Sequence, residues 1–112
     1  MSRIIRTLAI TTLCMISGTT FAQSSTGTIT LSALRTGWNS DSFALVPVGA
    51  IINPANCSTP DGYVSAAPAP GYQTFLSTAL TAFALDTSVA VTVHNTACIS
   101  GRPVLIGINL MH

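Results

Sequence analysis

The sequence predicts a mainly β (β+α) domain, a small barrel of five strands with one helix and one disulfide bond. Three observations lead to this fold class. Polar and apolar residues alternate along several short segments, which is the pattern of half-buried strands. The period changes once, to that of an amphipathic helix. Two cysteines remain in the part of the chain that we expect to be exported.

The first residues have the features of a secretory signal. Arg3 and Arg6 form a basic start, 8–16 is apolar and uncharged, and Thr20-Phe21-Ala22 ends in the small residue that a signal peptidase reads. The apolar stretch is too short for a transmembrane helix. We therefore expect 1–22 to be a cleaved signal peptide and the protein to be secreted or periplasmic, with no membrane span after cleavage.

The region 23–112 is long enough for one small domain, and we expect a single one. Cleavage removes Cys14 and leaves Cys57 and Cys98 in a compartment that permits disulfides. A bridge between them closes a loop of roughly 40 residues, which the chain-entropy model values at about 4 kcal/mol. The sequence therefore predicts one structural disulfide.

The first predicted strand follows from alternation. After a polar, frayed lead-in at 23–26, the segment 28–34 alternates, so that every second residue from Ile29 shares one face, extending to Arg35. The small and polar residues of 37–42 then have the composition of a turn. We expect a strand with one buried face, followed by a hairpin loop.

The next two predicted strands differ in length. The apolar segment 43–52 predicts a long strand that bends at Pro47 and Gly49, because proline removes a ladder donor and barrels need such bends. The segment 53–62 is a predicted loop that ends in a Pro-Asp-Gly turn. A short third strand is expected at 63–65.

The helix is predicted by a change of period after the prolines of 66–71. The expected buried stripe consists of Tyr72, Phe75, Leu76, Ala79, Leu80 and Phe83. Ser77, Thr78 and Thr81 lie on the other side, which carries no charge. Two alternatives stay open for that neutral face: it is solvated, or it is buried against a neighbour.

Two further strands, at 89–94 and 104–110, flank a predicted loop at 95–101 that carries Cys98. The element order is therefore β-β-β-α-β-β. This is the order of the OB-fold, a five-stranded and partly open barrel. No internal repeat or second domain is visible in the sequence.

The charge of the exported region is sparse and excludes several function classes. The basic residues of this region are Arg35 and Arg102, and there is no lysine. Its acidic residues are three aspartates, Asp41, Asp61 and Asp86. A nucleic-acid binder needs a basic stripe for phosphate contacts, so we expect no nucleic-acid partner. A net charge near zero opposes self-association only weakly. Two alternatives therefore stay open: a homo-oligomer and a solvated neutral monomer.

The sequence gives little support for catalysis or for metal binding. There is no Gly-x-Ser-x-Gly elbow and no glutamate, and the three aspartates occupy turns or the end of the helix. A zinc site built from the two cysteines with His94 and His112 conflicts with ligand spacing, because neither cysteine has a close partner. We predict a protein that is not an enzyme and holds no metal or other cofactor; both histidines are solvated or capping.

Trp38 is the strongest candidate for ligand contact. It lies in the first hairpin loop beside Asn39 and Asp41, where turn geometry does not require a large aromatic residue. Such a tryptophan can stack on a sugar ring while the polar neighbours bind its hydroxyl groups. The alternative is that Trp38 folds back and caps the barrel end.

Two sets of segments resemble known proteins. Thr26-Gly27-Thr28-Ile29-Thr30, and Ser77-Thr78-Ala79-Leu80 leading to Val89-Ala90-Val91-Thr92-Val93, resemble the B subunits of subtilase-type and pertussis-like AB5 toxins. The resemblance implies a secreted OB-fold that forms pentamers and binds sialylated glycans, with Thr26 at the position of a sugar-contacting serine. Asn53-Pro54-Ala55-Asn56-Cys57 and Gly101-Arg102-Pro103 resemble small secreted bacterial proteins of no assigned function.

The sequence thus favours a secreted, non-catalytic binding module, with a glycan as the leading ligand. The candidate ligand-binding residues are Thr26, Trp38, Asn39 and Asp41. The alternative is a structural or protein-interaction component of the bacterial envelope that has no small-molecule ligand.

Overall fold

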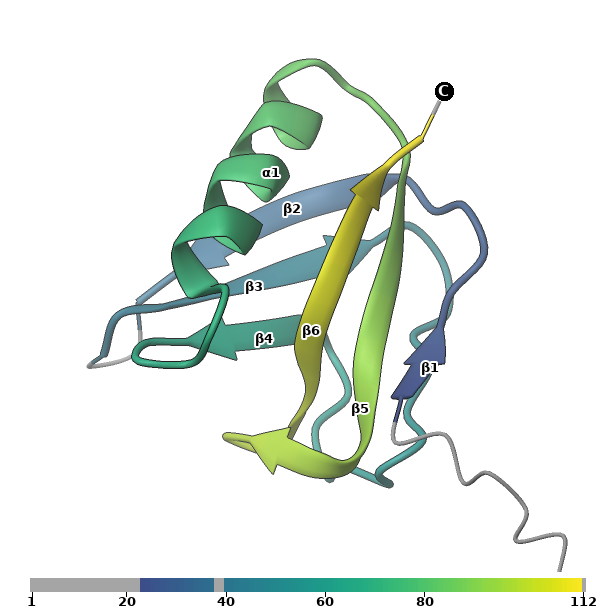
Figure 1. The fold of residues 1–112 in the computed structure, drawn as a ribbon. Coiled ribbons are helices and arrows are strands. Elements are labelled where there is room, and N and C mark those ends of the chain that lie inside the picture. Colours follow the sequence, from purple (N-terminus) through teal and green to yellow (C-terminus); the bar gives the residue numbers. More distant parts are fainter. Residues whose placement is uncertain (1–22, 38–39, 112) are drawn as a thin grey trace, which may run out of the picture.

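The computed structural model describes residues 23–37 and 40–111, which form one sheet and one helix (Figure 1). The strands are β1 (Gln23–Ser25), β2 (Leu31–Thr36), β3 (Ser42–Pro47), β4 (Tyr63–Ala66), β5 (Val89–Ile99) and β6 (Arg102–Leu110), and the helix is α1 (Tyr72–Ala84). The mainly β class with one helix, the helix position and the third strand at 63–65 are confirmed. The described part of the chain has six strands rather than five.

The sheet has the strand order β1-β5-β6-β4-β3-β2. All neighbours pair antiparallel except β4 and β6, which are parallel and meet at Val64 and Val104. The two edge strands, β1 and β2, do not pair with each other. A bridge joins Ile29, just before the edge strand β2, to Val89 in β5, the strand next to the other edge strand β1, with N–H···O distances of 2.7 and 2.9 Å.

The additional strand is β1, which the sequence predicted as a frayed lead-in. It pairs with β5, and its two serines bond across the pair: Ser24 donates to Asn95 Oδ1 at 2.5 Å, and the Ser25 hydroxyl lies 3.1 Å from that of Thr92. A polar segment is therefore ordered by hydrogen bonds to the neighbouring strand. Hydrophobic alternation gives no signal for such a strand.

A β-bulge changes the face that β2 presents. Its register against β3 shifts between Leu31 and Ala33, so Ser32 is the extra residue, and the Ser32 hydroxyl donates to Val46 O at 3.1 Å. Leu34, rather than Ala33 or Arg35, then packs against the core. The predicted alternation is wrong from this point because a bulge moves every later side chain to the opposite face.

The second strand ends earlier than predicted. β3 stops at Pro47 rather than bending through Pro47 and Gly49 to residue 52, and only the N–H of Val48 extends the pairing, to Thr30 O at 2.8 Å. Gly49 has a φ of 95°, outside the strand region. The following chain to residue 62 is a long loop, anchored where Ile52 N–H donates to the hydroxyl of Tyr63 at 3.0 Å.

The β5–β6 hairpin is longer than predicted, and the expected loop at 95–101 is wrong. β5 continues to Ile99 across an irregularity in which His94 Nδ1 accepts the N–H groups of Thr96 and Ala97, at 3.1 and 3.0 Å. The hairpin closes with the two residues Ser100 and Gly101, both at positive φ (51° and 77°). This is the geometry of a tight two-residue β-turn.

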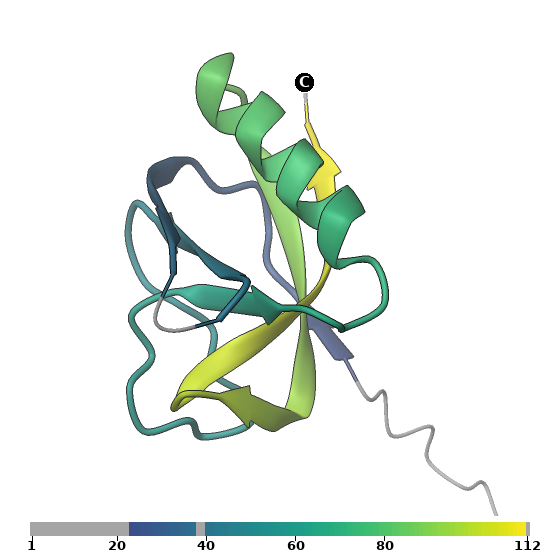
Figure 2. The ribbon, with the colours of Figure 1, turned by 90° about the vertical axis from the view of Figure 1, so that its left-hand side faces the viewer.

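The helix packs over one face of the sheet and contacts β2, β4 and β6 (Figure 2). Beneath it lies the core, whose buried side chains are Leu31, Phe43, Leu45, Tyr63, Tyr72, Ala79, Ala82, Val89, Val91, Val93 and Leu105. The predicted stripe is rotated: Ala82 is buried, whereas Leu80 and Phe83 are 51% and 47% exposed. The small Ala79 and Ala82 lie against the sheet, and this contact line leaves the two larger residues outside.

Replacing Ser65 with alanine tests the one side-chain polar atom that is buried without a partner among the described residues. Ser65 is 1% exposed, and its hydroxyl makes no hydrogen bond. Since an unsatisfied buried hydroxyl destabilises the fold, we expect Ser65→Ala to raise the free energy of unfolding, by up to about 1 kcal/mol. Urea unfolding provides the measurement.

Ser42→Ala is the matched control for this substitution, because Ser42 is also buried but donates its hydroxyl hydrogen to the carbonyl of Gly37. It should lower the free energy of unfolding by about 1 kcal/mol. Equal losses for both variants would contradict the assignment of Ser65 as unsatisfied.

The disulfide predicted from the cysteine count is present, and its removal should be severe. Cys57 and Cys98 are bonded, with their Cα atoms 5.8 Å apart and a separation of 41 positions in the sequence. Replacing both with serine frees this long loop in the unfolded chain, so the free energy of unfolding should fall by about 2–5 kcal/mol. Two free thiols in the unfolded, unreduced wild type would contradict the bond.

Candidate functional site

The long loop before β4 is fastened to the β5–β6 hairpin. The disulfide joins Cys57 to Cys98, and Thr59 N–H donates to Gly101 O at 2.7 Å. Within the loop, the Asn53 side chain bonds both the N–H and the carbonyl of Cys57, at 2.8 and 2.9 Å. A segment without regular secondary structure is thereby held in one place.

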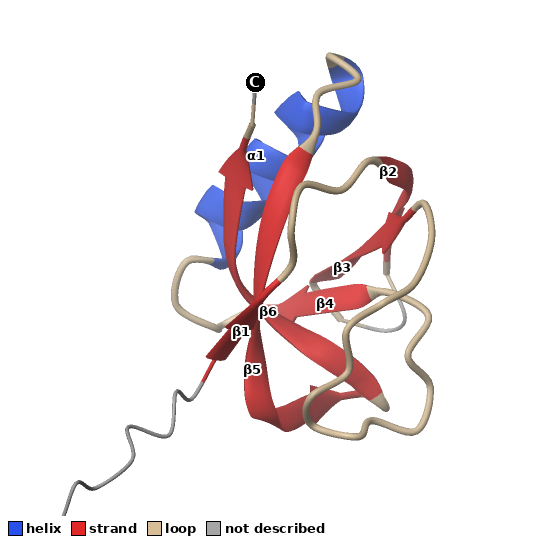
Figure 3. Ribbon diagram, turned by 90° about the vertical axis from the view of Figure 1, so that its right-hand side faces the viewer, coloured by secondary structure: helices blue, strands red, loops and turns tan. Residues whose placement is uncertain are grey.

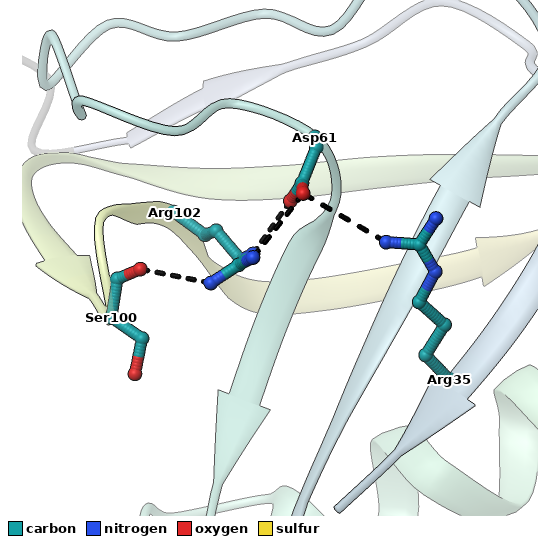
Figure 4. A network of polar contacts seen from close by, with 4 residues as sticks. All are labelled: Arg35, Asp61, Ser100 and Arg102. Carbon is teal, nitrogen blue, oxygen red and sulfur yellow. Dashed lines mark hydrogen bonds and ion pairs between the residues drawn. The ribbon is translucent and has the colours of Figure 1, made fainter. Parts of the chain in front are cut away.

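A charged pair completes this attachment (Figure 4). Arg102 at the start of β6 grips Asp61 with two bonds: Nε to Oδ1 at 2.5 Å and Nη2 to Oδ2 at 3.2 Å. Its Nη1 donates to Ser100 O at 2.9 Å. Such a two-pronged contact fixes the orientation of the carboxylate as well as its position.

Arg35 on β2 approaches the same carboxylate from the other side (Figure 4). Its Nη1 lies 3.8 Å from Asp61 Oδ2, and the side chains of Arg35 and Asp61 are 47% and 44% exposed. The bulge at Ser32 accounts for this placement, because Arg35 now lies on the opposite face from Leu34, which packs on the core. We call Arg35, Asp61 and Arg102 the charged cluster.

The electrostatics of the charged cluster follow from its composition of two guanidinium groups and one carboxylate. The hydrogen bonds from Arg102 lower the pKa of Asp61, opposed by partial desolvation and aided by the positive charges of Arg102 and Arg35. The hydrogen bonds that Arg102 donates to Asp61 raise the pKa of Arg102. The cluster therefore has a net charge of one positive unit at neutral pH, with donors on Arg35 and acceptor lone pairs on Asp61 open to solvent.

Of the predicted ligand-binding residues, the structure describes Thr26 and Asp41, and it does not bring these two together. Trp38 and Asn39 lie outside the described residues, and Asp41 is exposed in the turn between β2 and β3. Thr26 follows β1, which lies on the opposite side of the molecule from that turn (Figure 1). The N–H of Thr26 donates to Val91 O at 2.8 Å, and its Oγ1 accepts the N–H of Val91 at 2.9 Å, so its hydroxyl acts in strand pairing.

The sequence contains the three residues of the charged cluster but does not show that they lie together. The region 23–112 holds two arginines and three aspartates and has no pattern that pairs them. The structure selects Asp61 for both. The available signal was the Pro-Asp-Gly turn at 60–62 and the Ser-Gly dipeptide before Arg102, which mark two turns but do not show that they meet.

The part of the chain that the structure describes offers few groups for thiol or metal chemistry. Both disulfide sulfurs are consumed, so neither is available as a thiolate ligand. The described residues contain no group of three or more His, Cys, Asp or Glu side chains that could hold a metal ion. Among those same residues, no helix has the length and apolar character needed to cross a bilayer. A shallow cavity of about 300 Å³ at the start of α1 is lined by 67–69 and 71–74 and has no charged wall.

Comparison with known proteins finds no family model that matches the chain and no curated protein that matches it significantly.

Replacing Asp61 with asparagine tests the charged cluster through its pH dependence. Because Arg102 lowers the pKa of Asp61 below its ordinary value of 3.8, the ionised carboxylate stabilises the folded state at neutral pH. This contribution is present above 3.8 and is lost as the pH falls through the lowered pKa of the folded protein. We expect the wild type to unfold at higher urea than Asp61→Asn at pH 7, and the two to converge once the pH falls below the lowered pKa of the folded protein.

Asp86→Asn is the control for that comparison, since it removes the same charge beyond the end of α1, outside the charged cluster. A difference between the wild type and Asp61→Asn that did not change with pH would show that the carboxylate charge is not what stabilises the loop.

Proposed function

We propose that the protein is a secreted, non-catalytic binding module that recognises a glycan at the charged cluster and the adjoining turn between β2 and β3. The observation that carries this proposal is the exposed pair Arg35–Asp61, held rigidly by Arg102 and the disulfide. Arg35 lies two residues before the turn that begins at Gly37 and holds Trp38. Planar polar groups suit a sugar, whose hydroxyls need donors and acceptors together.

The fold supports the same proposal. The order β2-β3-β4-β6-β5, the helix between β4 and β5, and the Ile29–Val89 bridge between the two ends suit an OB-like barrel to which β1 adds a sixth strand. OB-folds commonly bind ligands on their second and third strands and on the loop after the first. In this chain those elements are β3, β4 and the turn before β3; Arg35 lies on β2, which pairs with β3, and Asp61 lies two residues before β4.

The resemblance to AB5 toxin B subunits adds a ligand class. If the chain functions in that manner, it forms a ring of five copies and binds a sialylated glycan. The carboxylate of such a sugar would bind the guanidinium group of Arg35. The net positive charge of the cluster also favours an anion. Thr26 would serve the pairing of β1 with β5 rather than the cluster, because its hydroxyl already bonds Val91.

A glycan array tests the proposal. We expect the wild type to bind, and Arg35→Gln and Trp38→Ala each to weaken binding by about tenfold or more, since each removes a direct contact worth over about 1 kcal/mol. Asp86→Asn is the control and should bind as the wild type does. Circular dichroism verifies that each variant is folded.

Two outcomes would contradict this proposal. Absence of binding to any glycan would exclude the ligand class. Binding that survives both Arg35→Gln and Trp38→Ala would place the site elsewhere.

The second candidate is an interaction component of the envelope, and one observation favours it. Large apolar side chains are exposed at the end of α1 and of β6, among them Leu85 at 69%. Exposed apolar surface of this kind marks contact sites for other macromolecules. This function does not need the charged cluster, so the array variants separate the two candidates.

A further inference from the structure

The two arginines of the charged cluster differ in how much of their hydrogen-bonding capacity is already used. Each of the three Arg102 nitrogens donates a hydrogen bond, two of them to Asp61 and one to Ser100 O, and its side chain is 17% exposed. The Arg35 side chain is 47% exposed, and its contact with Asp61, Nη1 to Oδ2 at 3.8 Å, is longer than a hydrogen bond. Arg35 is therefore the guanidinium group that can bind a ligand, and Arg102 fixes the carboxylate beside it.

The guanidinium group of Arg35 presents two neighbouring donors on the side away from Asp61. Since Nη1 is the nitrogen that approaches the carboxylate, the edge formed by Nε and Nη2 points away from it (Figure 4). Two parallel N–H groups of this kind match the two oxygens of a carboxylate. The region 23–112 has no lysine and no arginine besides Arg35 and Arg102, so this edge is where it can hold an acidic group in a fork.

Asp61 supplies the complementary function, because an ionised carboxylate only accepts hydrogen bonds. Its two oxygens receive one bond each from Arg102, which occupies two of about four lone pairs. The side chain is 44% exposed, and the hydrogen bonds from Arg102 lower its pKa, so it is ionised at neutral pH. A ligand group that meets Asp61 must therefore be a donor such as a hydroxyl group, because a second anion is repelled.

The backbones that carry Arg35 and Asp61 are held by different parts of the fold, so their spacing does not depend on the weak contact between the two side chains. Arg35 belongs to β2 and pairs with Ala44 of β3. Asp61 belongs to the long loop, which Figure 3 shows in tan beside the end of the β5–β6 hairpin and which the disulfide fastens there. Two groups of opposite charge are thus placed side by side before a ligand arrives, which lowers the entropic cost of binding.

We infer that the charged cluster recognises an acidic sugar at two points: the Nε–Nη2 edge of Arg35 binds its carboxylate, and Asp61 accepts a hydrogen bond from a neighbouring hydroxyl group. Asp61 is then a specificity-determining residue. A neutral sugar leaves Arg35 without an anion, and a simple anion such as acetate meets the charge of Asp61 without offering a donor. This inference rests on the proposed function and adds its ligand class, a hydroxy carboxylate, of which a uronic acid is a simple sugar form.

NMR of the arginine Nε–H groups tests the inference, because the region 23–112 has two such groups, those of Arg35 and Arg102. Protein exported by an expression host, with its N-terminus determined, is titrated separately with glucuronate, glucose and acetate at constant ionic strength. We expect the Arg35 signal to shift, with a dissociation constant at least about tenfold lower for glucuronate than for glucose or acetate, since only glucuronate makes both charge-assisted contacts.

Asp61→Asn separates recognition from a purely structural role of this residue. The substitution removes the charge that repels acetate, so acetate should bind more tightly and the dissociation constants for acetate and glucuronate should come within about threefold of each other. If Asp61 served only to anchor the loop, both ligands would weaken together and their ratio would not change. Asp86→Asn is the matched control, because it removes the same charge outside the charged cluster, and it should keep the ratio of the wild type.

Three results would overturn the inference. The first is an Arg35 signal that glucuronate does not move, and the second is a wild type that binds acetate or glucose as tightly as glucuronate; neither depends on a variant. The third is an Asp61→Asn variant, shown to be folded by circular dichroism, that keeps the ratio of the wild type. The proposed function stands in all three cases if the glycan array shows binding that depends on Arg35 and Trp38, whereas an array without binding overturns both.

Discussion

The attachment of the long loop to the β5–β6 hairpin is the constraint on which the rest of this structure depends. The disulfide, the Thr59–Gly101 hydrogen bond and the Arg102–Asp61 pair all act between the same two segments. Asp61 precedes the start of β4 by two residues, and Arg102 is the first residue of β6. The attachment therefore determines where the two strands start relative to each other. Their parallel pairing at Val64 and Val104 needs this help, because a single pair supplies little adhesion by itself.

Because charged residues are scarce, each one carries a large share of the charge of the protein. Arg35, Asp61 and Arg102 are three of the five described charged residues, and they share one cluster. The remaining surface is built from hydroxyls, amides and apolar side chains, many of which bond within the chain, as the α1 hydroxyls do. A protein of this composition has two kinds of surface to offer a partner. One is the charged cluster, whose hydrogen bonds are directional. The other consists of the exposed apolar side chains at the ends of α1 and β6, whose contacts are not directional.

These two surfaces lie near opposite ends of β6. It begins at Arg102 and ends at Leu110, and an extended chain of that length spans roughly 26 Å.

Local patterns in the sequence were enough to determine the class of the domain, the helix at 72–84 and the disulfide. These depend on period and on cysteine count, which a chain carries without its neighbours. The face of β2, the strand β1 and the buried side of α1 were decided by tertiary contacts: a bulge at Ser32, hydroxyl bonds to β5, and the close packing of Ala82. The charged cluster joins three segments distant in sequence, so no local pattern reveals it. Only the fold brings Arg35 and Arg102 to one carboxylate, because sheet register and the disulfide act across the whole chain.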